Sequence, residues 1–197
     1  MAIFTRAELK DFMMIDSSVT TEDAVLDFVV TAADAEVKHV IGSDVEDAGS
    51  VSARVYVPED DDCCIVDYFS TTTGLIVKSD TNGDGTFATT LTLNTDFEVL
   101  PRNGKRNGQT FSYYELRTLG GTDFVVYEDR PATVQVTARW GWTTVPGPIK
   151  YAALVYAASD ERVRALVRGE GGFTRWSREH AMAQLADYVH PFGVRVA

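Results

Sequence analysis

Acidic side chains supply the first candidate chemistry in this sequence of 197 residues. Asp80, Asn82 and Asp84 have the spacing of the first half of an EF-hand loop, in which oxygens at positions one, three and five face a Ca²⁺ ion. The second half of that pattern is missing, because Leu91 stands where a bidentate Glu is needed. A polar β-turn is the interpretation that we favour, and a weak Ca²⁺ site is the alternative.

A second acidic group consists of Asp60, Asp61 and Asp62, directly after Glu59. Adjacent carboxylates can hold a hard cation, but a charge run of this kind usually keeps a loop solvated. The sequence has no histidine pair at metal-ligand spacing, and it has no phosphate loop, nucleophile elbow or dinucleotide fingerprint. We therefore expect a protein that is not an enzyme and that holds no cofactor.

The charge of the chain is unevenly distributed. Its formal net charge is −11, from 18 basic and 29 acidic residues. From Arg139 onward there are 8 Lys or Arg against 5 Asp or Glu, so the acidic excess lies in the first 138 residues. This balance disfavours a tight grip on nucleic acid. It fits either plain solubility or a surface that repels a polyanion or meets a basic partner.

Apolar runs and cysteines indicate the compartment. No apolar run approaches the ~20 residues that span a bilayer, and the first residues lack the pattern of a signal peptide. The two cysteines, Cys63 and Cys64, are adjacent and cannot cross-link distant parts of the chain. We expect a product made in the cytoplasm, without membrane contact.

Hydrophobic periodicity predicts helices at both ends of the chain. Thr5 and Glu8 form a capping box before a short helix, and Thr20 or Thr21 caps a longer one that ends at Gly42. The core face expected for the second helix comprises Val25, Phe28, Val29, Ala32, Val37, Val40 and Ile41. After Pro146 the helical period returns, and a last helix follows Ser177.

Between these helices the period changes to two, which predicts strands. Val51, Ala53, Val55 and Val57 are expected to face the core. Further strands are expected at 63–69, 74–78, 87–93, 97–100, 111–119, 124–127 and 133–140, and Arg102–Gln109 is expected to be a mobile loop. The predicted fold class is α+β: a small helical bundle of two N-terminal and two C-terminal helices with a central antiparallel β insertion. We expect one composite domain, with the N-terminal helices in 1–48, the β insertion in 49–145, and the C-terminal helices and a terminal arm in 146–197.

The most distinctive segment joins the last strand to the following helix. Trp140 and Trp142 flank Gly141, and Pro146 precedes the helix, which predicts a structural hinge where the two indoles pack at the junction of sheet and helices.

This strand, the Trp-Gly-Trp turn, Val145-Pro146 and the alanine-rich helix resemble the head-to-tail adaptor family of tailed phages, also called head-tail connector or head completion proteins. The order of two helices, a β part and two helices agrees with that family. The resemblance is firm over 134–158 and looser elsewhere, and the 169–197 end departs from it.

The resemblance implies a structural virion protein: a ring of twelve copies beneath the portal protein, at the virion neck. Such a ring continues the DNA channel to a stopper or tail-completion protein, and the genome passes through during ejection without specific binding. A closed ring needs a heterologous interface between copies.

Arginine and aromatic residues, which interfaces favour, cluster near the C-terminal end. We expect Gly169–Ala197 to be loosely ordered in the free monomer and to bind the portal. The expected portal-binding residues are Arg162, Arg164, Arg168, Phe173, Arg175, Trp176, Arg178 and Phe192.

The acidic β insertion, with its tip at Arg102–Gln109, is expected to face the stopper and the channel. The residues assigned to this tip are Asp60, Asp61, Asp62, Arg102, Asn103, Lys105 and Arg106. An outward solubility patch is the alternative. The alternative function for the whole chain is a cytosolic ligand-binding or Ca²⁺-binding module that uses the Asp80–Gly85 turn.

Overall fold

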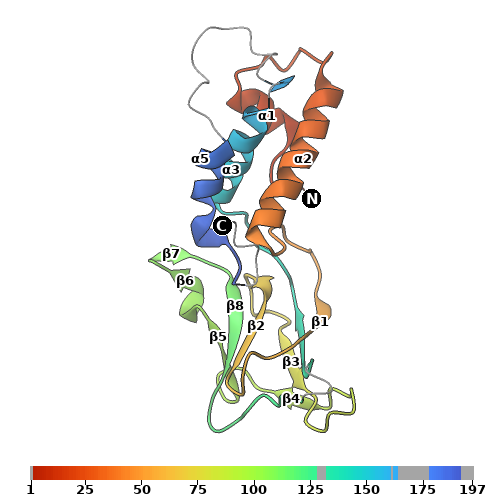
Figure 1. Ribbon diagram of the computed structural model, residues 1–197, viewed down its shortest axis with the longest axis vertical. Coiled ribbons are helices and arrows are strands. Elements are labelled where there is room, and N and C mark those ends of the chain that lie inside the picture. The colour runs from red at the N-terminus through yellow and green to blue at the C-terminus, as the bar shows by residue number, and fades with distance from the viewer. Residues whose placement is uncertain (1, 128–131, 161, 164–177, 192–197) are drawn as a thin grey trace. The chain divides into compact units, whose positions relative to one another are not determined.

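The computed structural model describes residues 2–127, 132–160, 162–163 and 178–191, and it is a mixed α/β fold with helices and antiparallel sheets (Figure 1). The chain forms two compact units. A helical unit comprises Met1–Glu46 and Thr144–Ala197, and a β unit comprises Asp47–Thr143. Each bound of the β unit lies two residues before the bound expected from the sequence.

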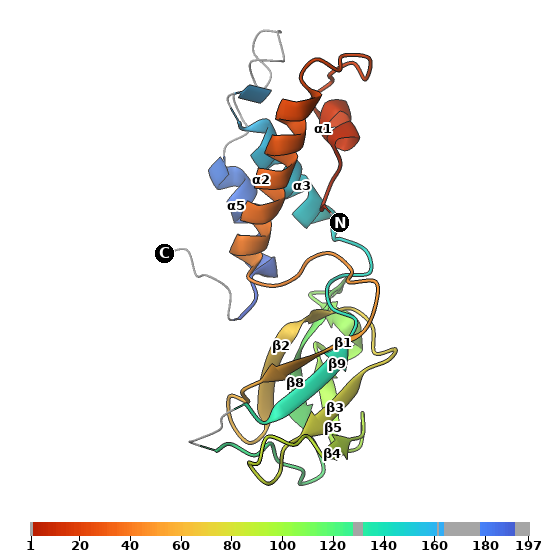
Figure 2. The ribbon, with the colours of Figure 1, turned by 90° about the vertical axis from the view of Figure 1, so that its right-hand side faces the viewer.

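In the helical unit, α2 packs against α1 and α3, and α3 packs against α5 (Figures 1 and 2). No helix among the described residues is both long and apolar enough to cross a membrane. The helices are α1 (Arg6–Phe12), α2 (Asp23–Ile41), α3 (Gly147–Ala158) and α5 (Arg178–Gln184), followed by the 3₁₀ turn η2 (Ala186–Tyr188).

Local signals in the sequence fix several of the helix ends. The Thr5 hydroxyl accepts the Glu8 N–H at 3.2 Å, and the Glu8 carboxylate accepts the Thr5 N–H at 2.8 Å, so the capping box is confirmed. Gly42 ends α2 in the left-handed conformation with φ 74°. At its start α2 differs from the prediction, because Glu22 precedes the first helical residue and makes no side-chain cap.

The buried face of α2 also differs from the prediction. Phe28 is 59% exposed, and the Arg162 guanidinium lies 5.0 Å from the centre of its ring. A stripe through Phe28 would continue at helical spacing to Glu36 and His39, whereas a stripe through Leu26 continues through aliphatic residues only. The longer aliphatic stripe is therefore the one that packs. Its buried members are Leu26, Val29, Val30, Ala33, Val37, Val40 and Ile41.

The β unit contains two antiparallel sheets (Figure 2), and buried side chains from both form one apolar core. The first sheet has the order β1-β9-β3-β4 and the second β2-β8-β5, and β6 and β7 form a separate hairpin. The strands are β1 (Ser52–Tyr56), β2 (Cys63–Phe69), β3 (Ile76–Ser79), β4 (Thr89–Leu91), β5 (Phe97–Leu100), β6 (Lys105–Arg106), β7 (Gln109–Thr110), β8 (Tyr113–Thr118) and β9 (Val134–Ala138). The strand expected at 124–127 is absent from these described residues.

The core of the β unit is built from both sheets and from the segment after β9. Trp140 is the largest of its fully buried side chains. Its neighbours in the cluster include Phe69 from β2 and Val136 from β9. The full cluster is Cys64, Val66, Phe69, Val77, Phe97, Leu116, Phe124, Val134, Val136, Ala138 and Trp140.

Strand β1 faces the opposite way from the prediction. Val51, Val55 and Val57 are 49%, 47% and 48% exposed, whereas Arg54 and Tyr56 turn inward. The Arg54 guanidinium lies 4.6 Å from the centre of a Trp140 ring, and the Tyr56 and Trp140 rings are 5.9 Å apart. The contacts with Trp140 thus turn the side of β1 that carries Arg54 and Tyr56 towards the core.

A shared carboxylate explains how β1 can bury polar groups. Asp67 on β2 accepts a hydrogen bond from Arg54 at 2.5 Å and one from the Tyr56 hydroxyl at 2.8 Å. Burial, with the nearby Asp67 charge, raises the pKa of Tyr56 far above its usual value, so the phenol remains a neutral donor. Each polar group that β1 directs inward therefore has a partner, as burial requires.

We expect Trp140→Ala to lower the free energy of unfolding by about 3–5 kcal/mol, because the indole is fully buried and its removal leaves a cavity in the core that both sheets share. Urea unfolding followed by far-UV circular dichroism measures this loss. The control is Val55→Ala on the exposed side of β1, where a change within about 0.5 kcal/mol is expected. Equal stability of Trp140→Ala and the wild-type chain would contradict the central role of the indole.

Candidate functional site

The Trp-Gly-Trp segment forms the end of the β unit from which the chain leaves for α3. Gly141 has φ 83°, and its N–H donates to the Tyr68 carbonyl oxygen at 2.7 Å. A glycine suits this position because the left-handed conformation strains other residues. Trp140 and Trp142 therefore both point into the β unit, to different sides of β2.

Trp142 belongs to an aromatic cluster outside the main core. Its ring centre lies 5.6 Å from that of Tyr68 and 5.0 Å from that of Phe111. Tyr114 completes the cluster, 5.9 Å from Tyr68 and 6.2 Å from Phe111. Edge-to-face contacts of this kind stabilise beyond their buried area. They hold Phe111, the residue that follows the β6–β7 hairpin, in a fixed place.

The β6–β7 hairpin replaces the loop expected over Arg102–Gln109. Asn107 and Gly108 have φ 52° and 79°, the backbone of a tight two-residue turn between paired strands. Arg102, in the 3₁₀ turn η1 (Arg102–Gly104) before the hairpin, donates two hydrogen bonds of 2.7 and 2.8 Å to Glu98. The segment is thus an ordered element with defined side-chain contacts.

The hairpin carries two cations, Lys105 and Arg106, which make different contacts. The Lys105 ammonium donates to the Thr110 hydroxyl at 3.0 Å and is otherwise exposed. The Arg106 guanidinium lies 5.1 Å from the centre of the Phe111 ring, within the range of a cation–π contact. Because Phe111 is fixed by the aromatic cluster, the positive charge of Arg106 has a fixed place as well.

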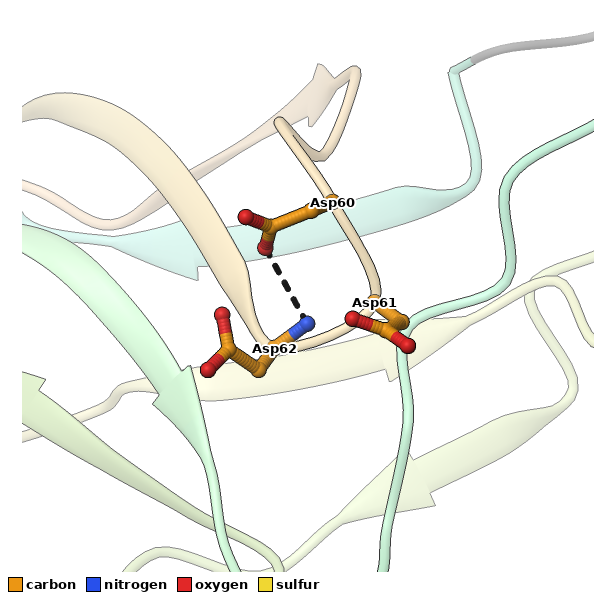
Figure 3. Close-up of side chains that lie close together, drawn as sticks. All are labelled: Asp60, Asp61 and Asp62. Atoms are coloured by element: carbon orange, nitrogen blue, oxygen red, sulfur yellow. Dashed lines mark hydrogen bonds between the residues drawn. The ribbon is translucent and has the colours of Figure 1, made fainter.

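Asp60, Asp61 and Asp62 form the acidic loop between β1 and β2 (Figure 3). All three are exposed, and their carboxylate oxygens lie within 4.8 Å of one another. The Asp60 carboxylate accepts the Asp62 N–H at 3.1 Å, as Figure 3 shows. The proximity of Asp60 also raises the pKa of the Asp62 carboxyl. The repulsion in this group is therefore only partly relieved by hydrogen bonds.

The backbone of this acidic loop is anchored to the rest of the β unit. The carbonyl oxygens of Asp61 and Asp62 accept the N–H groups of Phe124 at 2.7 Å and Thr118 at 3.0 Å. The loop thus presents its carboxylates from a defined position.

The acidic loop and the basic hairpin lie at opposite ends of the three-stranded sheet. At one end Cys63, the residue after the loop, pairs with Arg117 near the end of β8. At the other end Phe69 pairs with Tyr113, the first residue of β8, close to the hairpin. A strand of this length spans roughly 17 Å. The residues that the sequence assigned to one tip therefore form two surfaces of opposite charge.

The turn at Asp80–Gly85 is held together by its own backbone. The buried Asp80 carboxylate accepts N–H groups from Asn82 at 3.2 Å, Gly83 at 2.8 Å and Gly85 at 2.7 Å. Burial raises the pKa of Asp80, but these N–H donors outweigh burial, and the net shift is downward. Donor groups converging on a carboxylate are the arrangement of a polar turn, whereas a Ca²⁺ site directs oxygens inward.

The C-terminal residues expected to bind a portal fall in two classes. Arg164, Arg168, Phe173, Arg175, Trp176 and Phe192 lie outside the described residues. Arg162 and Arg178 are described, and both are more than half exposed: Arg162 pairs with Asp160 at 2.9 Å, and Arg178 pairs with Glu36 of α2.

The sequence analysis predicted a loosely ordered C-terminal end, but its described part, 178–191, packs in the helical unit. Ala181, Leu185 and Tyr188 are buried in the helical unit, and the His190 N–H donates to the Ile41 carbonyl oxygen at 2.8 Å. These apolar contacts make α5 and η2 part of the folded helical unit.

Comparison with known proteins identifies a structural likeness without a sequence family. No family model matches the sequence, and no curated protein matches it. A solved structure described as the neck of an empty GTA particle, computed with C6 symmetry, contains a chain of similar fold. The TM-score is 0.55 at 15% identity, over 99% of this chain and 92% of that chain. The fold is thus shared along nearly the full length of both chains.

We expect Asp80→Asn to lower the melting temperature, because an amide NH₂ in place of one oxygen would face N–H donors. Added Ca²⁺ should leave the melting temperature of the wild-type chain unchanged. The folded-state pKa of Asp80 lies below 3.8, so its contribution is present above that pH and is lost as the pH falls through the lowered value.

The control for this prediction is Asp84→Asn in the same turn, where an exposed carboxylate accepts the Thr86 N–H. Differential scanning fluorimetry from neutral pH to below pH 3.8 measures both variants. A Ca²⁺-dependent rise in melting temperature that Asp80→Asn removes would establish the cation site instead.

Proposed function

We propose that this chain is a structural protein of a virion neck, a head-to-tail adaptor that forms a ring beneath the portal and continues the DNA channel towards the tail. The observation that carries the proposal is the fold shared with a particle-neck chain over nearly the whole of both chains. The Trp-Gly-Trp turn and the proline before α3, which carry the sequence resemblance to adaptors, support it independently.

A homo-oligomeric ring is part of this proposal. The C6 symmetry of the neck structure that contains the similar chain is compatible with twelve copies, since a dodecameric ring contains a sixfold axis. A ring also requires two different surfaces on each copy. The two charged ends of the β unit differ from each other in this way.

The charge of the chain suits a channel component that does not retain DNA. Each copy has a net charge of −11, so a ring of copies repels the phosphates of DNA. A basic protein would instead displace the counterions of DNA and bind it. In this proposal the genome passes without specific binding, the arginines near the C-terminal end contact the portal, and the β unit is available to a stopper. The chain is made in the host cytoplasm and resides in the virion neck.

The location is tested by tagging the chain in its parent phage and imaging purified particles with gold-labelled antibody. Label at the junction of head and tail is the expected result. Deletion of the gene should yield DNA-filled heads without tails, and the wild-type gene supplied in trans should restore joining. Label along the tail or on the capsid faces, or tailed particles from the deletion, would refute the proposal.

The portal contact is tested with Arg162→Ala and Arg178→Ala combined. Both side chains are exposed, so the helical unit should stay folded while attachment to portal-bearing heads falls. Co-sedimentation with purified heads measures attachment. Arg117→Ala, an exposed arginine in the β unit, is the matched control. Attachment reduced equally by both changes, or by neither, would argue against the C-terminal arginines.

A further inference from the structure

We infer that the two charged ends of the β unit bind each other between neighbouring copies: the basic hairpin 105–110 of one copy contacts the acidic loop 59–62 of the next. This inference rests on the proposed ring and gives that ring its contact.

The hairpin offers an ordered positive surface. The hairpin carries two cations, Lys105 and Arg106, and Arg102 just before it is paired with Glu98. In the part of the chain that the structure describes, Lys105 makes no ion pair and bonds only to the Thr110 hydroxyl. The ring of Phe111 under Arg106 keeps the second charge in place. Arg106 therefore loses little side-chain entropy when an anionic partner binds this surface.

The acidic loop is the matching negative surface. Glu59, Asp60, Asp61 and Asp62 are all exposed. The charge of Arg117 acts on Asp62, but Arg117 forms its ion pair with Glu115, and no described cation forms an ion pair with any of the four. The crowding of three carboxylates within 4.8 Å is unfavourable in the isolated copy. Ammonium and guanidinium groups from another copy would relieve it. Charge complementarity therefore selects a second copy of this chain as the occupant.

The register of the sheet prevents this contact within one copy. Cys63–Arg117 and Phe69–Tyr113 pairing places the loop and the hairpin at opposite ends of β8. Both surfaces are anchored, the loop by backbone hydrogen bonds to the strand end and the segment beyond it, and the hairpin by its aromatic support. Each copy thus presents one donor surface and one acceptor surface, and such a heterologous contact closes into a ring when the rotation allows.

A charge exchange tests the contact. In one variant Asp60, Asp61 and Asp62 are replaced by Lys, so both ends are basic; in the other, Lys105→Glu and Arg106→Glu make both ends acidic. Each variant alone should lose the assembled species that the wild-type chain forms in low salt. A one-to-one mixture should recover it, because every contact in an alternating assembly then joins opposite charges. Sedimentation velocity measures the species, and negative-stain images show whether they are rings.

The matched control places the same three reversals in the helical unit, as Asp11→Lys, Asp16→Lys and Glu179→Lys. These residues are exposed, and the control should assemble like the wild-type chain. Assembly of either end variant alone, or failure of the mixture to recover it while circular dichroism shows both variants folded, would overturn the inference. A wild-type chain that stays monomeric at its highest soluble concentration would overturn it too.

Two further outcomes distinguish a contact between copies from nucleic-acid binding and from a wrong assignment of function. If Lys105→Glu and Arg106→Glu abolish DNA retention on a gel but leave self-association unchanged, the hairpin binds nucleic acid and the inference fails. If the exchange fails while gold label still marks the head-tail junction, the proposed function stands and only the ring contact is wrong.

Discussion

Burial of the Trp140 indole is the interaction on which the β unit depends. The indole N–H donates to the Ser52 carbonyl oxygen at 2.9 Å, and its rings contact Arg54 and Phe69, which lie in different sheets. One side chain thereby joins the two sheets and decides which side of β1 faces inward. The exposed Val55 of β1 is a consequence, because successive side chains of a strand point to opposite faces and Arg54 and Tyr56 occupy the inner one.

Elements with strong local signals could be predicted from the sequence, and elements placed by distant contacts could not. The capping box of α1 and strands β2 and β5 follow from neighbouring residues. The orientation of β1 depends on Asp67, which is 13 residues from Arg54 and in another strand. Alternating patterns show that a strand has two sides, but the partner that makes the polar side the buried one appears only in the fold.

The same distinction applies to the charged surfaces. Both charge runs are visible in the sequence. Asn107-Gly108 is a typical hairpin turn, but the polar residues around it led to the prediction of a mobile loop. Their separation is not visible, since it follows from the register of β2 on β8. A run of aspartates and a later run of cations can fall at one end of a sheet or at opposite ends, and only strand pairing distinguishes the two.

The spacing between the acidic loop and the basic hairpin depends on the packed core of the β unit. The distance between the acidic loop and the basic hairpin is set by the length of β8, and both are attached to backbone groups of the β unit. Because a close-packed core resists deformation, the two surfaces keep a constant spacing and orientation in every copy. A contact that joins them passes the same rotation from one copy to the next, and equal rotations are what a closed ring requires. The tryptophan that fixes the sheets therefore also limits the geometry of any assembly built through these ends.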